Sequence, residues 1–173
     1  MSKDIRGLLL GKKSALLERW FDIVLETYPP DSSSFLKNKK RQFANPVGYT
    51  ISRGLEHLLD ELLREGEMDV EKISSLLESI IRIRAIQDLT PSQALAFVFH
   101  LKKLVKEELG SAGTARSEEI EALESRIDAL ALISFDLYMK CREKIYDLKA
   151  NEVRNMTFRL LQKAKLVCEI PGE

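Results

Sequence analysis

Three observations predict an all-α fold with a long C-terminal helix. No segment alternates apolar and polar residues as a half-buried strand does, and apolar residues recur at helical spacing along nearly the whole chain. Neither glycine nor proline occurs between Ser117 and Pro171, so nothing there is expected to end a helix. The 173 residues, 45% of them hydrophobic, suffice for one domain with its own core.

The N-terminal part predicts one helix and then an irregular segment. We expect the helix over residues 2–28, bent near Gly11, because Pro29-Pro30 cannot continue it. We expect residues 31–43 to be irregular, with at most one short helical turn.

A cap and a proline mark the start of the next helix. Asn45 is a favoured N-cap and Pro46 a favoured first helical residue, and the helix should run to about Glu65, before Gly66. Gly54 lies inside its apolar stripe. Because glycine costs stability in a helix, we expect another helix to pass close to Gly54.

Two more helices precede the last one. The first is expected over residues 69–88. Thr90-Pro91 repeats the cap-then-proline pattern and opens a helix to about Leu109. After a loop, Ser117 is expected to cap the terminal helix, with glutamates in its first turn that favour the helix dipole.

The terminal helix is predicted to have about fifty residues, about 75 Å at 1.5 Å per residue. In residues 129–141, apolar side chains occur on all sides of the helix, which predicts burial in the core. Further on, a narrower stripe predicts a dimer or partner interface. The candidate interface residues are Ile145, Leu148, Met156, Leu160 and Val167. The alternative is that this stripe folds back onto its own domain.

We therefore divide the chain into a domain of residues 1–150 and an extension of the last helix over residues 151–173. A chain that ends after Ala150 is expected to fold but to be monomeric.

Arg84 is the one informative charge. It falls within the apolar stripe of its helix, four residues after Ile80, and a charge on an apolar face must be paired or must line a cavity. One interpretation is a structural pair with Asp88 or Asp136, in which losing Arg84 would cost roughly 3–5 kcal/mol. The other is a pocket arginine that holds an anionic ligand or reports a conformational change, with Gln87 and Asp88 beside it.

Metal and haem ligation find little support. The two cysteines, Cys141 and Cys168, have no metal-ligand spacing, and they imply no disulfide framework. His57 and His100 fall on the outer sides of their helical wheels, whereas a haem ligand should point into an apolar pocket. We expect no cofactor and a colourless protein.

Charge and motifs narrow the function classes. Lys+Arg and Asp+Glu are equal at 27, so the basic excess typical of nucleic-acid binders is missing. No apolar run approaches a membrane span, and no secretory signal is evident. Because the two cysteines imply no disulfide framework, we expect a cytoplasmic protein. No nucleophile elbow, phosphate loop or HExxH motif occurs, and we expect no enzyme.

Two strings resemble the N-terminal domain of the RsbRD-type regulators, which are co-antagonists of the RsbT kinase in stressosome signalling. They are FANPVGYTISRGLEHLLDEL, residues 43–62, and IIRIRAIQDLTPSQALAFVFHLKKLVKEEL, residues 80–109. The N-terminal LLLGKKSALLERWFDIVLETYP also fits, and the resemblance extends to about Ala150. Because the sequence ends at Glu173 without a STAS segment, we expect a stand-alone form.

The resemblance implies a globin-like, non-haem sensor domain that pairs with itself and passes a signal through its C-terminal helix. We thus expect a homodimer that regulates by binding a signalling or redox-complex protein or by sensing a small ligand. A haem- or tetrapyrrole-binding protein and an adaptor for an anaerobic membrane redox complex are the alternatives.

Overall fold

The computed structural model describes residues 5–37, 43–87, 89–110 and 118–166, and the secondary structure of these residues is entirely α-helical. The predicted all-α fold class and its long C-terminal helix are confirmed. The helices are α1 (Ile5–Gly11), α2 (Lys13–Leu25), α3 (Pro30–Leu36), α4 (Pro46–Leu63), α5 (Val70–Ala85), α6 (Pro91–Gly110) and α7 (Glu118–Lys163).

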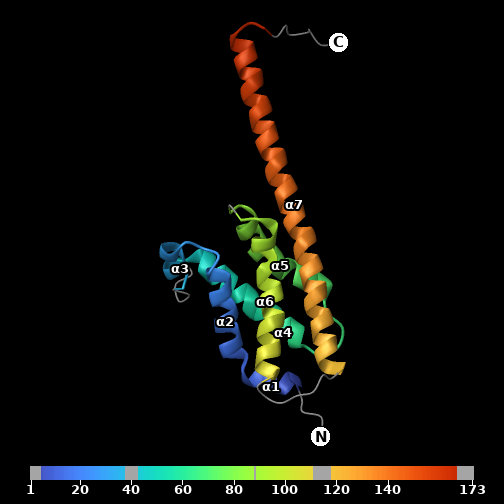
Figure 1. Cartoon of the computed structure of the whole chain (residues 1–173). Coiled ribbons are helices and arrows are strands. Elements are labelled where there is room, and N and C mark those ends of the chain that lie inside the picture. Colours follow the sequence, from blue (N-terminus) through green and yellow to red (C-terminus); the bar gives the residue numbers. More distant parts are fainter. Residues whose placement is uncertain (1–4, 38–42, 88, 111–117, 167–173) are drawn as a thin grey trace.

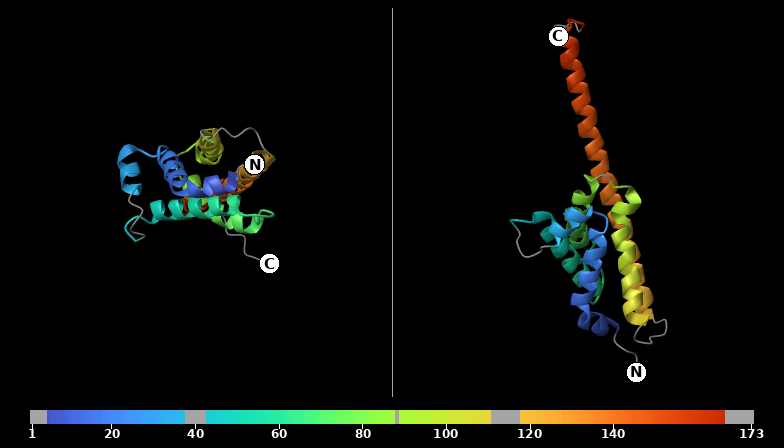
Figure 2. Two further views of the ribbon diagram at one scale, coloured as in Figure 1. Left: turned by 90° about the horizontal axis from the view of Figure 1, so that it is seen from below. Right: turned by 60° about the vertical axis from the view of Figure 1, so that its left-hand side comes forward.

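The first part of α7 lies against α5 and α6, while α2 packs on α4 and α6. The rest of α7 rises alone from the domain (Figure 1), and the right-hand view of Figure 2 shows the same projecting rod. With 46 residues, α7 is about 69 Å long at 1.5 Å per residue. No helix among the described residues is long and apolar enough to cross a bilayer.

The N-terminal region departs from the expected single helix. Lys12 leaves helical geometry between α1 and α2, and its ammonium bonds the carboxylate of Glu108 on α6 at 2.8 Å. Arg19 of α2 reaches the other oxygen of Glu108 at 2.7 Å. The hydrogen bond from Lys12, with help from Arg19, lowers the pKa of Glu108. The break lies at Lys12, directly after Gly11, near which the sequence predicts a bend.

The segment expected to be irregular contains most of helix α3, which is longer than the single short turn expected there, so that expectation is wrong for residues 31–36. Pro30 sits at the first helical position, where its missing N–H costs nothing. Asn45 then ties α3 to α4, because its side-chain amide donates to the carbonyl of Leu36 at 2.9 Å and its oxygen accepts from the amide of Gly48 at 2.9 Å. Asn45 therefore caps α4 as predicted and also holds the end of α3.

Other helix starts also follow the prediction. Asp69 caps α5 by accepting from the amide of Lys72 at 2.9 Å. Thr90 and Gln93 form a reciprocal capping box at the start of α6. The predicted cap Ser117 lies outside the described residues.

Gly54 marks a close crossing of α4 and α5, as expected. A Cβ built on Gly54 would lie 2.8 Å from Cδ1 of the buried Ile80. Gly48 is a second close approach, where a Cβ would strike the carbonyl of Leu36 and the side chain of Asn45. The sequence pattern had not singled out Gly48.

One prediction about α7 is wrong. Residues 129–141 were expected to be buried all round, yet Leu132 is 70% exposed and Phe135 is 49% exposed, with Met139 also exposed. Only one face of this stretch enters the core, through Leu130, Ser134 and Tyr138. The reason is that α5 and α6 both lie on the same side of α7, so its opposite face has no neighbour among the described helices.

Candidate functional site

Arg84 is fully buried at the C-terminal end of α5, as its position in the apolar stripe predicts. Its Nε donates to the carbonyl of Ala94 at 2.7 Å, and one terminal nitrogen donates to the carbonyl of Gln93 at 2.8 Å. The other terminal nitrogen lies 3.3 Å from the hydroxyl of Thr27. The guanidinium group thus joins the turn after α2, the end of α5 and the first turn of α6.

The partners of Arg84 are neutral oxygens, whereas the sequence suggested a carboxylate. Asp136 is exposed on α7 and forms no ion pair with Arg84 within the described ranges. Asp88, the other suggested partner, lies outside those ranges. Burial therefore dominates and lowers the pKa of Arg84, although the Tyr28 hydroxyl acts in the opposite direction.

Packing around Arg84 is dense. Its guanidinium carbon lies 5.7 Å from the centre of the Phe97 ring, which stacks on Trp20. The Trp20 indole donates to the carbonyl of Phe97 at 2.7 Å, and Gln87 donates to the hydroxyl of Tyr28 at 2.8 Å. The structure therefore places Arg84 and Gln87 in one polar cluster that ties helices together. A ligand role for this cluster stays a prediction.

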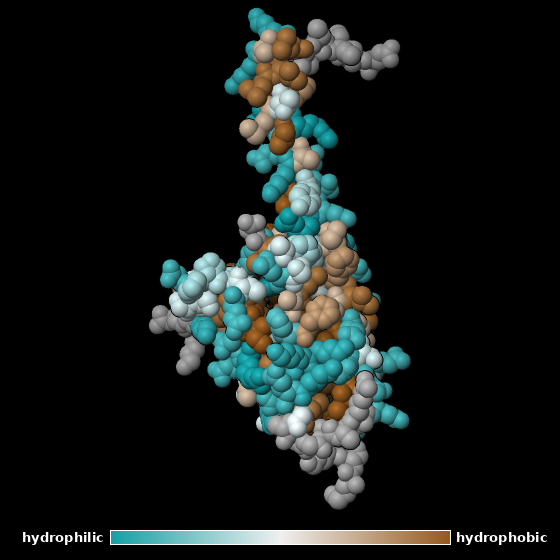
Figure 3. Space-filling model, in the orientation of Figure 1, coloured by the Kyte–Doolittle hydropathy of each residue, from teal (hydrophilic) through white to brown (hydrophobic). Residues whose placement is uncertain are grey.

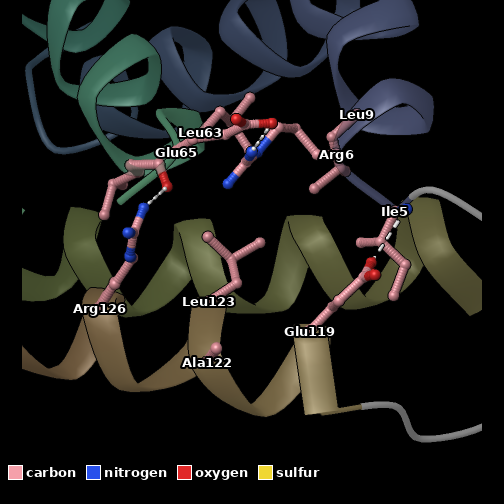
Figure 4. Close-up of a pocket in the computed structure, with 10 residues that line it drawn as sticks. Ile5, Arg6, Leu9, Leu63, Glu65, Glu119, Ala122, Leu123 and Arg126 are labelled. Atoms are coloured by element: carbon pink, nitrogen blue, oxygen red, sulfur yellow. Dashed lines mark hydrogen bonds and ion pairs between the residues drawn. The ribbon is translucent and has the colours of Figure 1, made fainter. Parts of the chain in front are cut away.

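A pocket of about 380 Å³ lies at the opposite end of the domain, between α1, the end of α4 and the start of α7 (Figure 4). Leu9, Leu62 and Leu123 contribute its apolar wall. Two arginines border it: Arg6 pairs with Glu65 at 2.8 Å, and Arg126 donates to the carbonyl of Leu62 in α4 and to that of Arg64 just after it. Sequence reasoning missed this pocket because its residues come from three distant segments.

His57 and His100 are both exposed, in line with their helical wheels. Neither imidazole is buried in the core where a haem iron would need a ligand. Among the described residues, no group of three or more His, Cys, Asp or Glu side chains is arranged to hold a metal ion. Cys141 is half-buried on α7, and burial raises the pKa of its thiol.

An exposed apolar stripe runs along the described part of α7. One residue recurs every seven positions and is exposed each time, from the domain to the end of the rod: Leu132, Met139, Tyr146, Val153 and Leu160. Phe135 and Met156 occupy the companion position three residues further on. This 3–4 spacing is the pattern by which one helix packs along another. We call these seven residues the exposed stripe.

Within the domain, α6 broadens the exposed stripe. Phe99 of α6 is 57% exposed, and it shares a helix face with Lys102, which bonds Asp128 of α7 at 2.9 Å. Phe99 therefore lies on the edge of α6 that borders α7. Together with Leu132, Phe135 and Met139 it forms what we call the α6–α7 patch. Figure 3 shows brown side chains gathered where α7 leaves the domain.

The predicted interface residues divide into three groups. Met156 and Leu160 belong to the exposed stripe, and Leu160 is 65% exposed. Ile145 packs partly against the core, and Leu148, although 62% exposed, lies on the other side of the helix because it follows Tyr146 by only two residues. Val167 lies outside the described residues. The sequence missed the α6–α7 patch, although the seven-residue spacing of Leu132, Met139 and Tyr146 signals it.

Comparison with known proteins identifies a family. The model of the RsbT co-antagonist protein rsbRD N-terminal domain matches residues 14–153, which include every helix from α3 to α6, nearly all of α2 and most of α7. No curated protein and no solved structure gave a match. The globin relationship implied by the sequence resemblance stays a prediction. The match covers well over half of the chain, and the chain therefore belongs to the RsbT co-antagonist rsbRD N-terminal domain family.

Proposed function

We propose that this chain is a non-enzymatic regulatory domain that dimerises through the α6–α7 patch and passes a signal along α7 to a protein partner. The proposal rests chiefly on the exposed stripe, which begins on the domain surface and recurs every seven residues onto the free rod, with Arg142 and Lys149 at the companion position between Phe135 and Met156. Membership in a family of regulatory domains supports it. A small-molecule signal would find room in the pocket beside Arg6 and Arg126, which borders the start of the same helix.

The α6–α7 patch suits a second copy of the chain. Four large apolar side chains from two adjacent helices are exposed together, and such patches on a folded domain usually mark interfaces. Two copies related by a two-fold axis would each present the same two helices, which is the usual form of a homodimer. Helices α6 and α7 of both copies would then form a four-helix contact.

Sedimentation velocity tests the dimer. We expect the full chain to be dimeric at micromolar concentration and the variant with Leu132→Glu and Phe135→Glu to be monomeric, because carboxylates cannot be buried without partners. Leu148→Glu is the matched control: it changes a leucine of similar exposure, 62% against 70% for Leu132, on the other side of α7 and should remain dimeric.

A full-length monomer would remove the homodimer from the proposal. The patch also changes the expectation for a chain that ends after Ala150. Such a chain keeps all four patch residues, so we now expect it to remain dimeric. A monomeric truncated chain would place the dimer contact on the rod instead.

Haem binding remains the alternative that the exposed histidines disfavour. Absorption spectra after addition of haemin decide the matter. We expect no stoichiometric Soret band, and a band that His100→Ala abolishes would favour the alternative.

A further inference from the structure

The end of α7 is solvent-exposed on all sides. Every described residue from Tyr146 to Leu166 is exposed, and none packs against the domain. Residues 153–166, which we call the distal segment, contain four cations and no carboxylate although the whole chain is neutral. These cations are Arg154, Arg159, Lys163 and Lys165.

The distal segment has one apolar face with cations on both edges. Val153, Met156, Leu160 and Leu161 follow the i, i+3, i+7, i+8 spacing that places side chains on one helix face. At 100° per residue, Arg154 lies along one edge of this face, and Arg159 and Lys163 lie along the opposite edge. Lys165 follows the end of α7 at Lys163. Apolar anchors at this spacing are the means by which a helix docks into a groove of another protein.

A second copy of the distal segment is a poor partner for it. Lys149 and Lys163 occupy the same position of the seven-residue repeat as Phe135 and Met156. In a parallel, in-register pair, each lysine would face its own copy in the core of the contact, where like charges are costly. In either direction, two segments that each carry four cations repel one another. The α6–α7 patch has no such obstacle. We therefore assign dimerisation to the patch and a different partner to the distal segment.

A lipid surface is also less suitable than a protein. The apolar face is narrow, and it continues the exposed stripe of a straight helix whose other half is packed into a domain. Interfacial helices instead lie flat and rely on a broad apolar face of tryptophan, phenylalanine or leucine. Phe158, the one aromatic residue of the distal segment, lies about 140° from the centre of the apolar face.

From the charge and the spacing we infer that the distal segment docks onto an acidic helical partner that presents carboxylates on both sides of an apolar strip. This inference deepens the proposed function, on which it rests, because it specifies the chemistry of the partner that α7 contacts. Attraction between the opposite charges would speed the encounter and select the partner, while the apolar anchors would hold it.

A model peptide tests the inference with the full-length chain. The probe is a labelled helical peptide whose heptad repeat has leucine at positions a and d and glutamate at positions e and g. Two copies of this peptide should not pair with each other, because their glutamates repel. The matched peptide carries lysine at e and g. By fluorescence anisotropy at low salt, the glutamate peptide should bind about tenfold more tightly or better, and the difference should shrink as salt screens the charges.

Variants connect binding to the distal segment. The double change Arg159→Glu with Lys163→Glu should abolish the preference for the glutamate peptide, and Leu160→Glu should weaken binding of either peptide. Lys140→Glu is the control, because it reverses an exposed charge on the part of α7 that lies beside the domain. All these side chains are exposed, so the variants should keep the helicity and melting temperature of the parent.

Three results would overturn the inference. The first is equal affinity for both peptides, or a preference that survives the double change. The second is binding to vesicles of phosphatidylcholine and phosphatidylglycerol without binding to the glutamate peptide, which would assign the segment to a lipid surface. The third is self-association that Leu160→Glu abolishes. Failure of the patch variants to dissociate the dimer would refute the proposed dimer contact alone and leave the peptide result unaffected.

Discussion

Replacing Arg84 by methionine should cost little more than an ordinary core substitution. Methionine keeps the unbranched stem that fills the space between α2, α5 and α6, and it removes the charge. The carbonyls of Gln93 and Ala94 lie in the first turn of α6, where helix geometry gives each a second donor four residues later. The Thr27 hydroxyl keeps its bond to the carbonyl of Val24 at 2.7 Å. No buried acceptor is left without a donor.

The magnitude follows from these partners. Breaking a buried ion pair costs roughly 3–5 kcal/mol because one charge stays buried and unpaired. Arg84 leaves no such charge among the described residues, and its loss also ends the burial of a cation. The charge-assisted hydrogen bonds that disappear set the net cost, which we place at about 1–2 kcal/mol for Arg84→Met. Arg84→Ala adds a cavity, as long side chains cut to alanine do, and should cost about 2 kcal/mol more.

Urea unfolding followed by circular dichroism measures both variants, at one protein concentration because a dimer unfolds in a concentration-dependent way. A cost of 1–2 kcal/mol corresponds to a fall of about 2–8 °C in melting temperature for a chain of this size. If Arg84→Met costs 4 kcal/mol or more, the guanidinium has a counter-charge and our account of its partners is wrong. If the methionine and alanine variants have the same free energy of unfolding, packing of the Arg84 stem contributes nothing to stability.

Four other outcomes follow from the structure. Gly48→Ala should destabilise more than Gly54→Ala in thermal melts, because its Cβ meets a backbone carbonyl whereas that of Gly54 meets a side chain. The pKa of Glu108 is lowered in the folded chain, so the ionised Glu108 stabilises the fold at any pH above its ordinary pKa of 4.5, and this stabilisation is lost as the pH falls through the lower pKa of the folded state. Glu108→Gln should therefore make the free energy of unfolding fall less steeply at acid pH. Cys141 should react with iodoacetamide at pH 8 more slowly than a free thiol in a peptide, because its raised pKa leaves less thiolate; a Cys168→Ser background isolates the signal. A chain that ends after Ala150 should melt at the temperature of the full chain, since the residues it loses are exposed within the described range.

Sequence reasoning succeeded where the cause is local. Asn45 with Pro46 and Thr90 with Pro91 fix helix starts through caps that lie within three residues, and Arg84 is buried because its own helix dictates which face it shares. The polarity of a residue and its position along a helix are enough for such predictions.

Sequence reasoning failed where the burial of a residue depends on how many other helices lie against its own helix. The apolar run around Leu132 reads as core from every side, but α5 and α6 cover only one side of α7. The partners of Arg84 were missed for a similar reason: backbone carbonyls carry no sequence signal, so a search for charge partners finds carboxylates. The pocket beside Arg126 brings together α1, α4 and α7, whose proximity no local pattern reports.

The uninterrupted course of α7 makes it a lever. About 27 Å of helix separate Ile145, the last residue that packs against the core, from the end of α7 at Lys163. No glycine or proline weakens this length. A tilt of about 5° at the level of Ile145 would displace the tip by about 2 Å, and a rotation of the helix about its own axis would turn the distal face by the same angle. Movements too small to rearrange the core would thereby shift the side chains at the tip, such as Leu160, by about 2 Å relative to a bound partner.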